Sequence, residues 1–305
     1  MSAGPVEIIP PREVPLGGLR AMTVRRTLPS RARTTVGAWC FADHYGPDLV
    51  TETGGMVVAP HPHTGLQTVS WLFDGEIEHR DSAGHRAIIR PGEVNLMTAG
   101  RGISHSEIST PDTSVLRGAQ LWVALPKGAS EVVPDFESYT PPLLHGEGWN
   151  ARVFVGSVLG DASPVTTYTP LLGAELRLRA STTLTVPVDP TYEHGVLLDA
   201  GRLVLDGSRI APSELAFRPA GANTLHLTAE DDCRLLLLGG TPFGEAIVMW
   251  WNFVGRTHEE VVEHRRQWQA LLAGEPQERF ALPDDDRNPS IPAPELPNVR
   301  LRPRS

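Results

Sequence analysis

The stretch Leu72-Phe-Asp-Gly75-Glu-Ile-Glu-His-Arg-Asp-Ser-Ala-Gly84, with Ile89-Arg-Pro91-Gly-Glu-Val94 and Thr98-Ala-Gly100 after it, alternates strand-like runs with turn residues. The same order of elements returns later, in Leu198-Asp-Ala-Gly201-Arg-Leu-Val-Leu-Asp-Gly207, Ile210-Ala-Pro212-Ser-Glu-Leu215 and Pro219-Ala-Gly221. Each copy predicts strand, glycine turn, strand, hairpin turn, strand, proline turn and strand. This internal repeat indicates two copies of one small β barrel.

The rest of the chain also favours an all-β fold. The 305 residues include 29 glycines and 28 prolines, and most apolar segments are short and rich in Val, Ile, Thr, Trp and Leu. Such segments, separated by turn residues, are typical of a mainly antiparallel sandwich or barrel. Strands are predicted at residues 66–73, 76–80, 86–90, 93–98, 117–125, 151–158, 171–179, 196–199, 202–205, 214–217, 224–228 and 233–238.

Two pairs of potential metal ligands lie close to the first copy of the repeat. His61 and His63 are separated by one residue, and so are His105 and Glu107. Both pairs are in strand-like sequence, where side chains at i and i+2 leave the same face about 6–7 Å apart. If the two strands face each other, three imidazoles and one carboxylate converge. That ligand set suits a first-row divalent metal and not calcium or magnesium, and it leaves an octahedral ion two open positions for water or substrate.

The repeat predicts that the second barrel lacks a metal site. Counting from the glycine turns that the two copies share gives a counterpart for each candidate ligand. Only one of the four counterparts is a histidine, so we expect no metal there and a hydrogen-bonded role for that histidine. The counterparts of His61, His63, His105 and Glu107 are, in that order, Pro187, Asp189, His226 and Thr228.

Composition and charge limit the classes of function. Hydrophobic residues make up 40% and charged residues 21% of the chain, as in ordinary globular proteins. The net charge of −9 argues against binding to nucleic acid or to an anionic membrane. No apolar run reaches the length of a membrane span, and the first residues do not resemble a secretory signal. Two isolated cysteines, Cys40 and Cys233, favour a reducing compartment, so we expect a cytoplasmic protein.

A helix is predicted near the end of the chain. Thr257 and Glu260 have capping-box spacing, an apolar stripe runs to Leu272, and Gly274 ends the helix. The stripe is interpreted as core packing. The predicted order is an N-terminal metal-binding barrel at residues 1–126, a linker at 127–150, a metal-free second barrel at 151–256, the helix at 257–274 and a proline-rich extended tail at 275–305.

The candidate ligands lie in two motifs that resemble the cupin motifs in the form found in pirins. The first is His61-Pro-His63-Thr-Gly-Leu-Gln67, ending at Gly75, and the second is Gly100-Arg-Gly-Ile-Ser-His105-Ser-Glu107. The resemblance covers most of the chain, because it extends through Phe41-Ala-Asp-His-Tyr-Gly-Pro47, Glu78-His-Arg-Asp-Ser82, Gln120-Leu-Trp-Val-Ala-Leu-Pro126 and Pro242-Phe-Gly-Glu-Ala-Ile-Val-Met249.

The resemblance implies two tandem cupin barrels of the double-stranded β-helix, or jelly-roll, type with one metal in the first. Pirins hold one iron with three histidines and a glutamate, which by motif position are His61, His63, His105 and Glu107. Iron(II) is the expected metal, with manganese, nickel, copper and zinc as alternatives. Many cupins have a glutamate ligand where this chain has Gln67. Since Glu107 supplies the carboxylate, we expect Gln67 to hydrogen-bond around the ligands.

Two functions stay open, because some pirins are described as quercetin 2,3-dioxygenases and others as redox-sensitive transcriptional co-regulators. The first is a non-haem iron dioxygenase that cleaves flavonols such as quercetin, with Glu107 taking the proton of the 3-hydroxyl group. The second is a non-enzymatic, iron-dependent redox sensor that binds a regulatory protein partner. A buried apolar pocket of substrate size would favour the enzyme, and a shallow site beside a flat charged face would favour the sensor.

Several other residues have two interpretations. Arg101 would either orient an anionic substrate oxygen or form a structural ion pair. Four apolar residues would either line a pocket or pack in the core: Phe41, Trp71, Phe73 and Met97. Three histidines are expected at the surface or around the ligands: His44, His79 and His85. The N-terminal arginines are interpreted as a solvated strand and turn: Arg20, Arg25, Arg26, Arg31 and Arg33.

Overall fold

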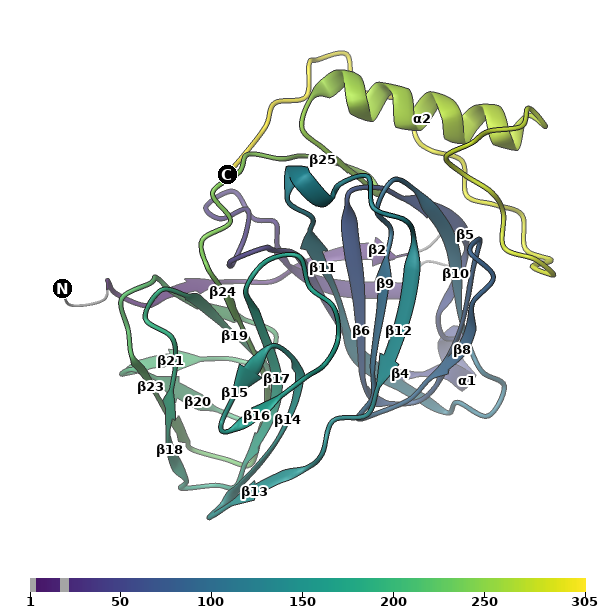
Figure 1. Ribbon diagram of the computed structural model, residues 1–305. Coiled ribbons are helices and arrows are strands. Elements are labelled where there is room, and N and C mark those ends of the chain that lie inside the picture. Colours follow the sequence, from purple (N-terminus) through teal and green to yellow (C-terminus); the bar gives the residue numbers. More distant parts are fainter. Residues whose placement is uncertain (1–3, 17–21) are drawn as a thin grey trace.

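The structure is a computed structural model that describes residues 4–16 and 22–305. Two β barrels lie side by side, and helix α2 (His258–Leu272) lies over the first of them (Figure 1). The all-β class, with two tandem barrels and a short C-terminal helix, is confirmed. No helix within the described residues is long and apolar enough to cross a membrane.

The first barrel consists of a seven-stranded and a four-stranded sheet. The larger sheet has the order β12-β9-β6-β11-β4-β3-β2, and its strands are β2 (Arg12–Leu16), β3 (Met22–Leu28), β4 (Trp39–Leu49), β6 (Leu66–Asp74), β9 (Val94–Thr98), β11 (Val115–Ala124) and β12 (Asp135–Tyr139). The smaller has the order β5-β10-β7-β8, formed by β5 (Val57–His63), β7 (Ile77–Asp81), β8 (Arg86–Ile89) and β10 (Ile103–Ser109).

The second barrel is built in the same way. Its larger sheet has the order β1-β22-β19-β24-β17-β14-β13, from β1 (Glu7–Ile9), β13 (Leu144–Gly146), β14 (Trp149–Val155), β17 (Leu171–Leu178), β19 (Glu193–Ala200), β22 (Leu215–Arg218) and β24 (Cys233–Gly240). Its smaller sheet has the order β18-β23-β20-β21, from β18 (Thr183–Pro187), β20 (Leu203–Leu205), β21 (Ser208–Ile210) and β23 (Thr224–Ala229). The shared strand order confirms the internal repeat.

Short elements complete the structure. Two hairpins are formed by β15 (Ser157–Val158) with β16 (Asp161–Ala162), and by β25 (Val248–Trp250) with β26 (Phe253–Gly255). A short helix α1 (Val50–Thr53) follows β4, and a 3-10 turn, η1 (Lys127–Ala129), follows β11. Helix α2 begins one residue after Thr257, whose side chain accepts a hydrogen bond from the Glu260 N–H, as the capping-box spacing predicts.

The strand pairing shifts three of the expected boundaries. Strand β1, in the segment assigned to the first barrel, pairs with β22 of the second. The expected linker at 127–150 does connect the barrels, but its strand β12 pairs with β9 and its strand β13 pairs with β14. Hairpin β25–β26, assigned to the second barrel, is bridged to the first at Thr64 and Phe253. Each added strand gives backbone partners to an otherwise open sheet edge, and local composition does not encode such long-range pairing.

The proline-rich tail is extended but packed against the protein. Its residues after α2 form no named helix or strand, as expected, yet Phe280 and Ala293 are buried in one cluster with Trp268 of α2. The N–H of Ile291 donates to the Pro60 carbonyl at 2.8 Å, which brings the tail next to β5. The apolar stripe of α2 therefore packs in a core, as interpreted from its sequence.

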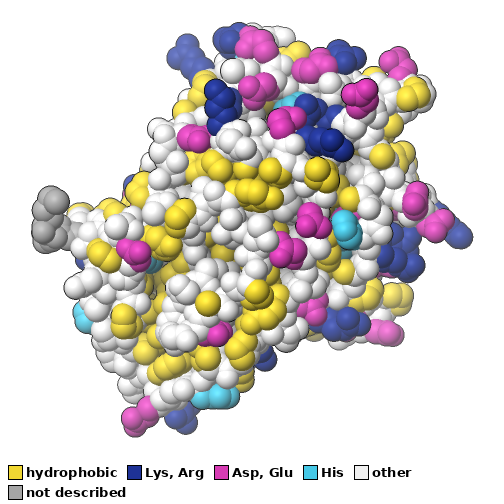
Figure 2. All heavy atoms as spheres, in the orientation of Figure 1, with side chains coloured by type: hydrophobic (Ala, Val, Ile, Leu, Met, Phe, Trp, Pro, Cys, Tyr) yellow, Lys and Arg dark blue, Asp and Glu magenta, His cyan; other side chains and the backbone are white. Residues whose placement is uncertain are grey.

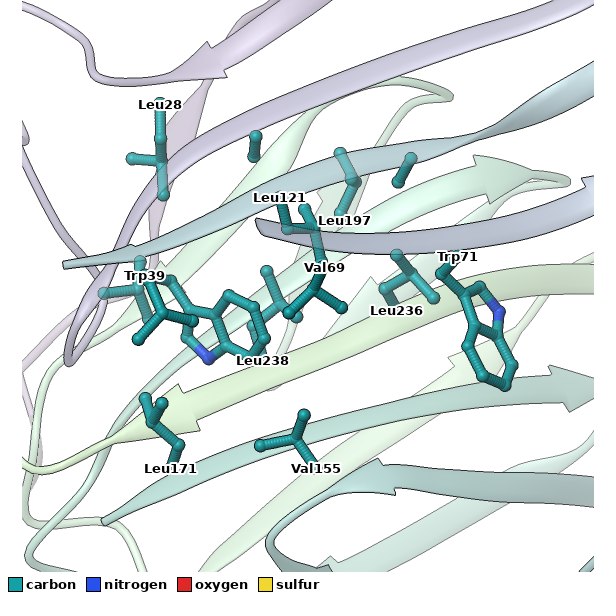
Figure 3. Close-up of a cluster of buried hydrophobic side chains, with 14 of the residues drawn as sticks. Leu28, Trp39, Val69, Trp71, Leu121, Val155, Leu171, Leu197, Leu236 and Leu238 are labelled. Atoms are coloured by element: carbon teal, nitrogen blue, oxygen red, sulfur yellow. The ribbon is translucent and has the colours of Figure 1, made fainter. Parts of the chain in front are cut away.

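A hydrophobic core joins the two barrels. Figure 3 shows Trp71, Val69 and Leu121 of the first barrel facing Leu236 and Leu238 of the second. The Trp39 indole N–H, also in this core, donates to the Leu172 carbonyl at 3.0 Å across the interface. Trp71 stacks on Phe154 of the second barrel, with ring centroids 4.6 Å apart. Because this aromatic surface is buried between the barrels, we expect the two barrels to unfold together.

The interior of the second barrel corrects the counterparts derived by counting. Pro187, Asp189 and His226 are exposed and Thr228 is half-buried, while the inward-facing positions of β18 and β23 belong to Leu184, Val186, Leu225 and Leu227. For Pro187 and Asp189 the reason is loop length. Five residues, 188–192, separate β18 from β19, whereas two residues, 64–65, separate β5 from β6, so a count back from the glycine turn reaches different points of the two strands. His226 is hydrogen-bonded to Thr185, as expected.

We expect Phe154→Ala to lower the free energy of unfolding by about 3–5 kcal/mol, because it opens a cavity in the core shared by the barrels. Chemical denaturation followed by tryptophan fluorescence should still show one transition. The control is Val133→Ala, where the side chain is 69% exposed and the change should stay within about 0.5 kcal/mol. If the first barrel unfolded in a separate transition that Phe154→Ala did not shift, the shared core would be contradicted.

Candidate metal centre

The pairing of β5 with β10 brings the two sequence pairs together. His61 lies opposite His105 and His63 lies opposite Ile103 in this antiparallel ladder. Because alternate residues share a face, His61, His63 and His105 all turn into the interior of the first barrel, where all three are buried. The register shifts between His105 and Glu107, which marks a bulge at this point of β10.

The three imidazoles are close enough to share one ion. The ring centroids of His61 and His105 are 4.4 Å apart, and His63 lies 5.0 Å from each of them. One ligand nitrogen of each histidine lies within 4.8 Å of the others. The sequence therefore predicted correctly that these side chains converge.

The hydrogen bonds leave ring nitrogens available. His61 Nδ1 lies 2.9 Å from the Ala59 carbonyl and must donate to it, so His61 Nε2 carries the lone pair. Among the described residues, His63 Nδ1 and His105 Nε2 have no hydrogen-bond partner although both are buried. Buried polar atoms are nearly always satisfied, and converging lone pairs of neutral imidazoles are what a divalent transition metal needs.

The environment keeps these histidines neutral. Burial lowers the pKa of His61 to about 4. Burial, and then the neighbouring histidines, hold the pKa values of His63 and His105 well below the ordinary range. Removal of water disfavours the charged imidazolium, and a second positive charge nearby disfavours it further. Neutral imidazole is the form that binds metals.

Glu107 lies beside His105 and lines the same cavity as the three histidines. Its ligand oxygen is within 4.8 Å of nitrogens of His105 and His79, which makes a second possible ligand group that shares His105 with the first. Burial raises the pKa of Glu107, although the Ser70 hydroxyl donates to its Oε1 at 3.2 Å. The full set of His61, His63, His105 and Glu107 remains a prediction, and His79 is a neighbour that the motif spacing did not identify.

A cavity of about 270 Å³ opens from the candidate ligands. It is lined by the candidate ligands and by mostly apolar residues from six separate segments: Leu16, Phe41, Val58, Trp122, Trp251 and Ile291. The rings of Phe41 and Trp122 stack with their centroids 3.9 Å apart in the wall of this cavity. Of the four apolar candidates from the sequence, Phe41 lines the cavity, whereas Trp71 and Phe73 pack between the barrels and Met97 lies in another buried cluster.

Arg26 is a cavity residue that sequence reasoning assigned to a solvated strand. Its guanidinium makes a bidentate ion pair with the buried Asp43, at 2.6 and 2.8 Å, and lies over the Phe41 ring at 4.2 Å from the centroid. The pairing of β3 with β4 sets Arg26 directly opposite Asp43. Asp43, two residues after Phe41, was the only residue in the sequence that could have indicated a buried partner for Arg26. Arg20 lies outside the described residues.

Two other predicted residues do not reach the site. Arg101 is exposed and borders a separate surface hollow with Glu131 and Arg279, so the structure does not support a substrate contact. Gln67 is buried, but its amide donates to Thr98 and to the Thr166 carbonyl of the second barrel. Arg101 lies in the turn between β9 and β10, and Gln67 is turned toward the second barrel.

The remaining histidines have distinct surroundings. His44 faces the second barrel, where its Nε2 lies 2.7 Å from Asp199, and this buried pair links the two barrels. His79 is buried beside His105, and His85 is half-buried near Asp81.

Gly65, two residues after His63, has a φ of +67°, and a Cβ there would lie 2.3 Å from the Val254 carbonyl oxygen. The glycine therefore lets β26 approach the end of β5.

Comparison with known proteins gives the family. A family model described as Pirin matches residues 21–123, and one described as Pirin C-terminal cupin domain matches residues 173–278. A Pseudomonas aeruginosa protein, provisionally named quercetin 2,3-dioxygenase, is 42% identical over 94% of this chain and 89% of its own length. A pirin-like protein of Caulobacter vibrioides is 36% identical over 89% of this chain and 94% of its own.

A solved structure agrees with the sequence relatives. The crystal structure of a quercetin 2,3-dioxygenase from Acinetobacter baumannii superposes with a TM-score of 0.91 at 36% identity, covering 98% of this chain and 97% of that one. The chain belongs to the pirin family, and its two barrels are cupin barrels.

We expect single replacement of His61, His63 or His105 by alanine to abolish stoichiometric metal binding and leave a folded β protein, because the ligands act as a set at the mouth of a barrel with its own core. Elemental analysis should find about one ion per parent chain and circular dichroism should be unchanged. His226→Ala, in the second barrel, is the matched control. Full metal occupancy in His63→Ala would show that the ligands are wrongly assigned.

Metal binding should resist mild acid. Because the pKa of His61 is lowered to about 4, protons compete with the metal only as the pH approaches that value, not near pH 6.5 as at an exposed histidine site. Occupancy measured by equilibrium dialysis should stay nearly constant from about pH 8 to about pH 6. The raised pKa of Glu107 adds to the loss at the acidic end. Half-loss of metal near pH 6.5 would contradict the buried, neutral site.

Proposed function

We propose that the protein is a metal-dependent dioxygenase that acts on flavonols such as quercetin, with molecular oxygen as the second substrate and iron(II) as the metal. The observation that carries this proposal is the cavity beside the converging histidines, because its walls are largely apolar and aromatic. Concave apolar pockets with a few converging polar groups are typical of small-molecule sites. The names of the relatives from Pseudomonas aeruginosa and Acinetobacter baumannii agree with this assignment.

The volume and the aromatic walls of the cavity favour a small aromatic ligand. Its volume of about 270 Å³ lies just below the range of roughly 300–1,000 Å³ common for small-molecule pockets. Phe41 and Trp122, which stack on each other, both contribute aromatic surface to the cavity wall. Arg26, at the edge of this wall, would attract the anionic oxygen of a deprotonated substrate, and Asp43 holds the guanidinium in place.

Glu107 is proposed as the proton acceptor. When bound, a divalent metal would supply Lewis acidity toward a substrate hydroxyl and the redox chemistry of dioxygenation. His61, His63 and His105 would hold it through their unprotonated nitrogens. The Glu107 carboxylate would take the proton from the flavonol 3-hydroxyl group, and its raised pKa would make it a better base than an exposed glutamate. The apolar walls would exclude water from the reacting atoms.

The direct test is aerobic turnover of quercetin by protein reconstituted separately with iron, manganese, nickel, copper and zinc. We expect consumption of the flavonol together with oxygen, led by the iron form, and none by the metal-free protein. The rival proposal is an iron-dependent redox sensor that binds a regulatory protein. If no metal form consumes any flavonol, while ferrous and ferric protein differ in affinity for a protein partner, the sensor replaces the enzyme. Figure 2 shows that basic and acidic side chains are interspersed over α2 and the tail, not gathered into one charged face.

Glu107→Gln should separate metal binding from chemistry. The amide has nearly the same shape as the carboxylate but cannot accept the substrate proton, so turnover should fall by about 10²–10⁴-fold while the three histidines retain part of the metal. Turnover and metal content are measured on the same sample. A variant that oxidises flavonols as fast as the parent would show that Glu107 is not the base.

A further inference from the structure

A row of polar side chains leads from the surface to the candidate ligand His105. The outermost is His85, whose Nδ1 lies 3.1 Å from Asp81 Oδ2. The same carboxylate oxygen lies 3.2 Å from His79 Nε2, and His79 Nδ1 lies 3.3 Å from His105 Nδ1. Asp81 and His79 are buried, so these contacts are made away from bulk water. The row depends on the pairing of β7 with β10, in which Asp81 lies opposite His105.

Each contact determines where the next proton sits. The Asp81 carboxylate can only accept, so His79 Nε2 must carry the hydrogen and donate it. A neutral His79 then has its lone pair on Nδ1, and this atom accepts from the N–H at His105 Nδ1. His105 is left with its lone pair on Nε2, the buried atom that has no hydrogen-bond partner in the described part of the chain.

The row is held from both sides. Asp81 Oδ1 accepts the backbone N–H groups of Ala83 at 2.9 Å and His85 at 3.0 Å, which orients the carboxylate. The Phe136 ring stacks on the His79 ring, with centroids 4.6 Å apart and planes 25° apart. Phe136 belongs to β12, in the segment between the barrels, so an aromatic residue distant in sequence limits the rotation of the His79 imidazole.

We propose that Asp81 and His79 are positioning residues of the metal centre: together they hold His105 in the tautomer whose Nε2 faces the ion. This inference rests on the metal centre proposed above. Outer hydrogen bonds of this kind orient metal-binding histidines and raise their basicity. His79 is not assigned as a ligand itself, although one of its nitrogens lies near His105 and Glu107, because both of its ring nitrogens are engaged, with Asp81 and with His105.

The sharpest test is Asp81→Asn. The amide keeps the shape of the carboxylate, and its oxygen can still accept from Ala83 and His85, but its NH₂ group then faces His79 Nε2. His79 must move its proton to Nδ1, which opposes the N–H of His105 and drives that proton to Nε2. We expect Co(II) affinity to fall by about 10–100-fold, measured by calorimetric titration, with a changed visible absorption of the bound ion.

Variants at His79 and His85 complete the test. Asparagine at position 79 can place its side-chain oxygen near the former Nδ1 and accept from His105, so Co(II) should bind more tightly to His79→Asn than to His79→Ala. His85→Gln removes only the outermost contact and should bind like the parent. Circular dichroism establishes that each variant is folded, and the near-isosteric Asp81→Asn keeps the test valid if the His79 variants do not fold.

The outcomes separate the two proposals. If the parent binds Co(II) and Asp81→Asn binds it equally well, the positioning role is overturned and the metal centre stands. If His79→Ala loses the ion completely while Asp81→Asn keeps parental affinity, His79 is a ligand and the positioning role is again overturned. A parent that binds no Co(II) overturns the metal centre and the inference with it.

Discussion

The register of β5 against β10 is the constraint on which the site depends. His61 and His105 face each other only because these strands pair as they do, and His63 shares their face because it is two residues from His61. A shift of the pairing by one residue would turn the imidazoles out of the barrel. The hydrophobic residues of the same strands would then lose their buried positions as well, so folding of the first barrel and assembly of the site are the same event.

The two barrels share one strand arrangement but differ in the side chains that face their interiors. Both have the same strand order, yet β5 and β10 bury three imidazoles and a carboxylate, whereas β18 and β23 bury leucine and valine at their inward-facing positions. An apolar interior needs no partners beyond good packing. A polar interior is tolerated only where its donors and acceptors are satisfied or are reserved for a ligand. The difference between the barrels lies in which side chains face inward, not in how the strands are connected.

Local patterns in the sequence predicted most of the strands, the repeat, helix α2 and the convergence of His61, His63 and His105. The strands, the repeat and the helix follow from local patterns, whereas the convergence of the histidines was inferred from two motifs whose strands, β5 and β10, are far apart in sequence. Contacts that depend on strand pairing without such a motif were not predicted: Arg26 with Asp43, β12 with β9, and Phe136 with His79, although His79 itself was expected at the surface or around the ligands. The counterpart Asp189 was wrong for a related reason, because the count to it crossed a loop, 188–192, that is three residues longer than the loop 64–65 in the first barrel.

Burial keeps the histidines neutral and ready to bind a metal, but it also lowers the stability of the metal-free fold. His63 and His105 each bury a ring nitrogen without a hydrogen bond from the described protein, and an unsatisfied buried polar group costs about 1–3 kcal/mol. A ligand that binds the folded state alone returns stability in proportion to the logarithm of its concentration over its dissociation constant. A metal at these nitrogens would therefore stabilise the first barrel, and through the core around Trp71 and Phe154 it would also stabilise the second barrel.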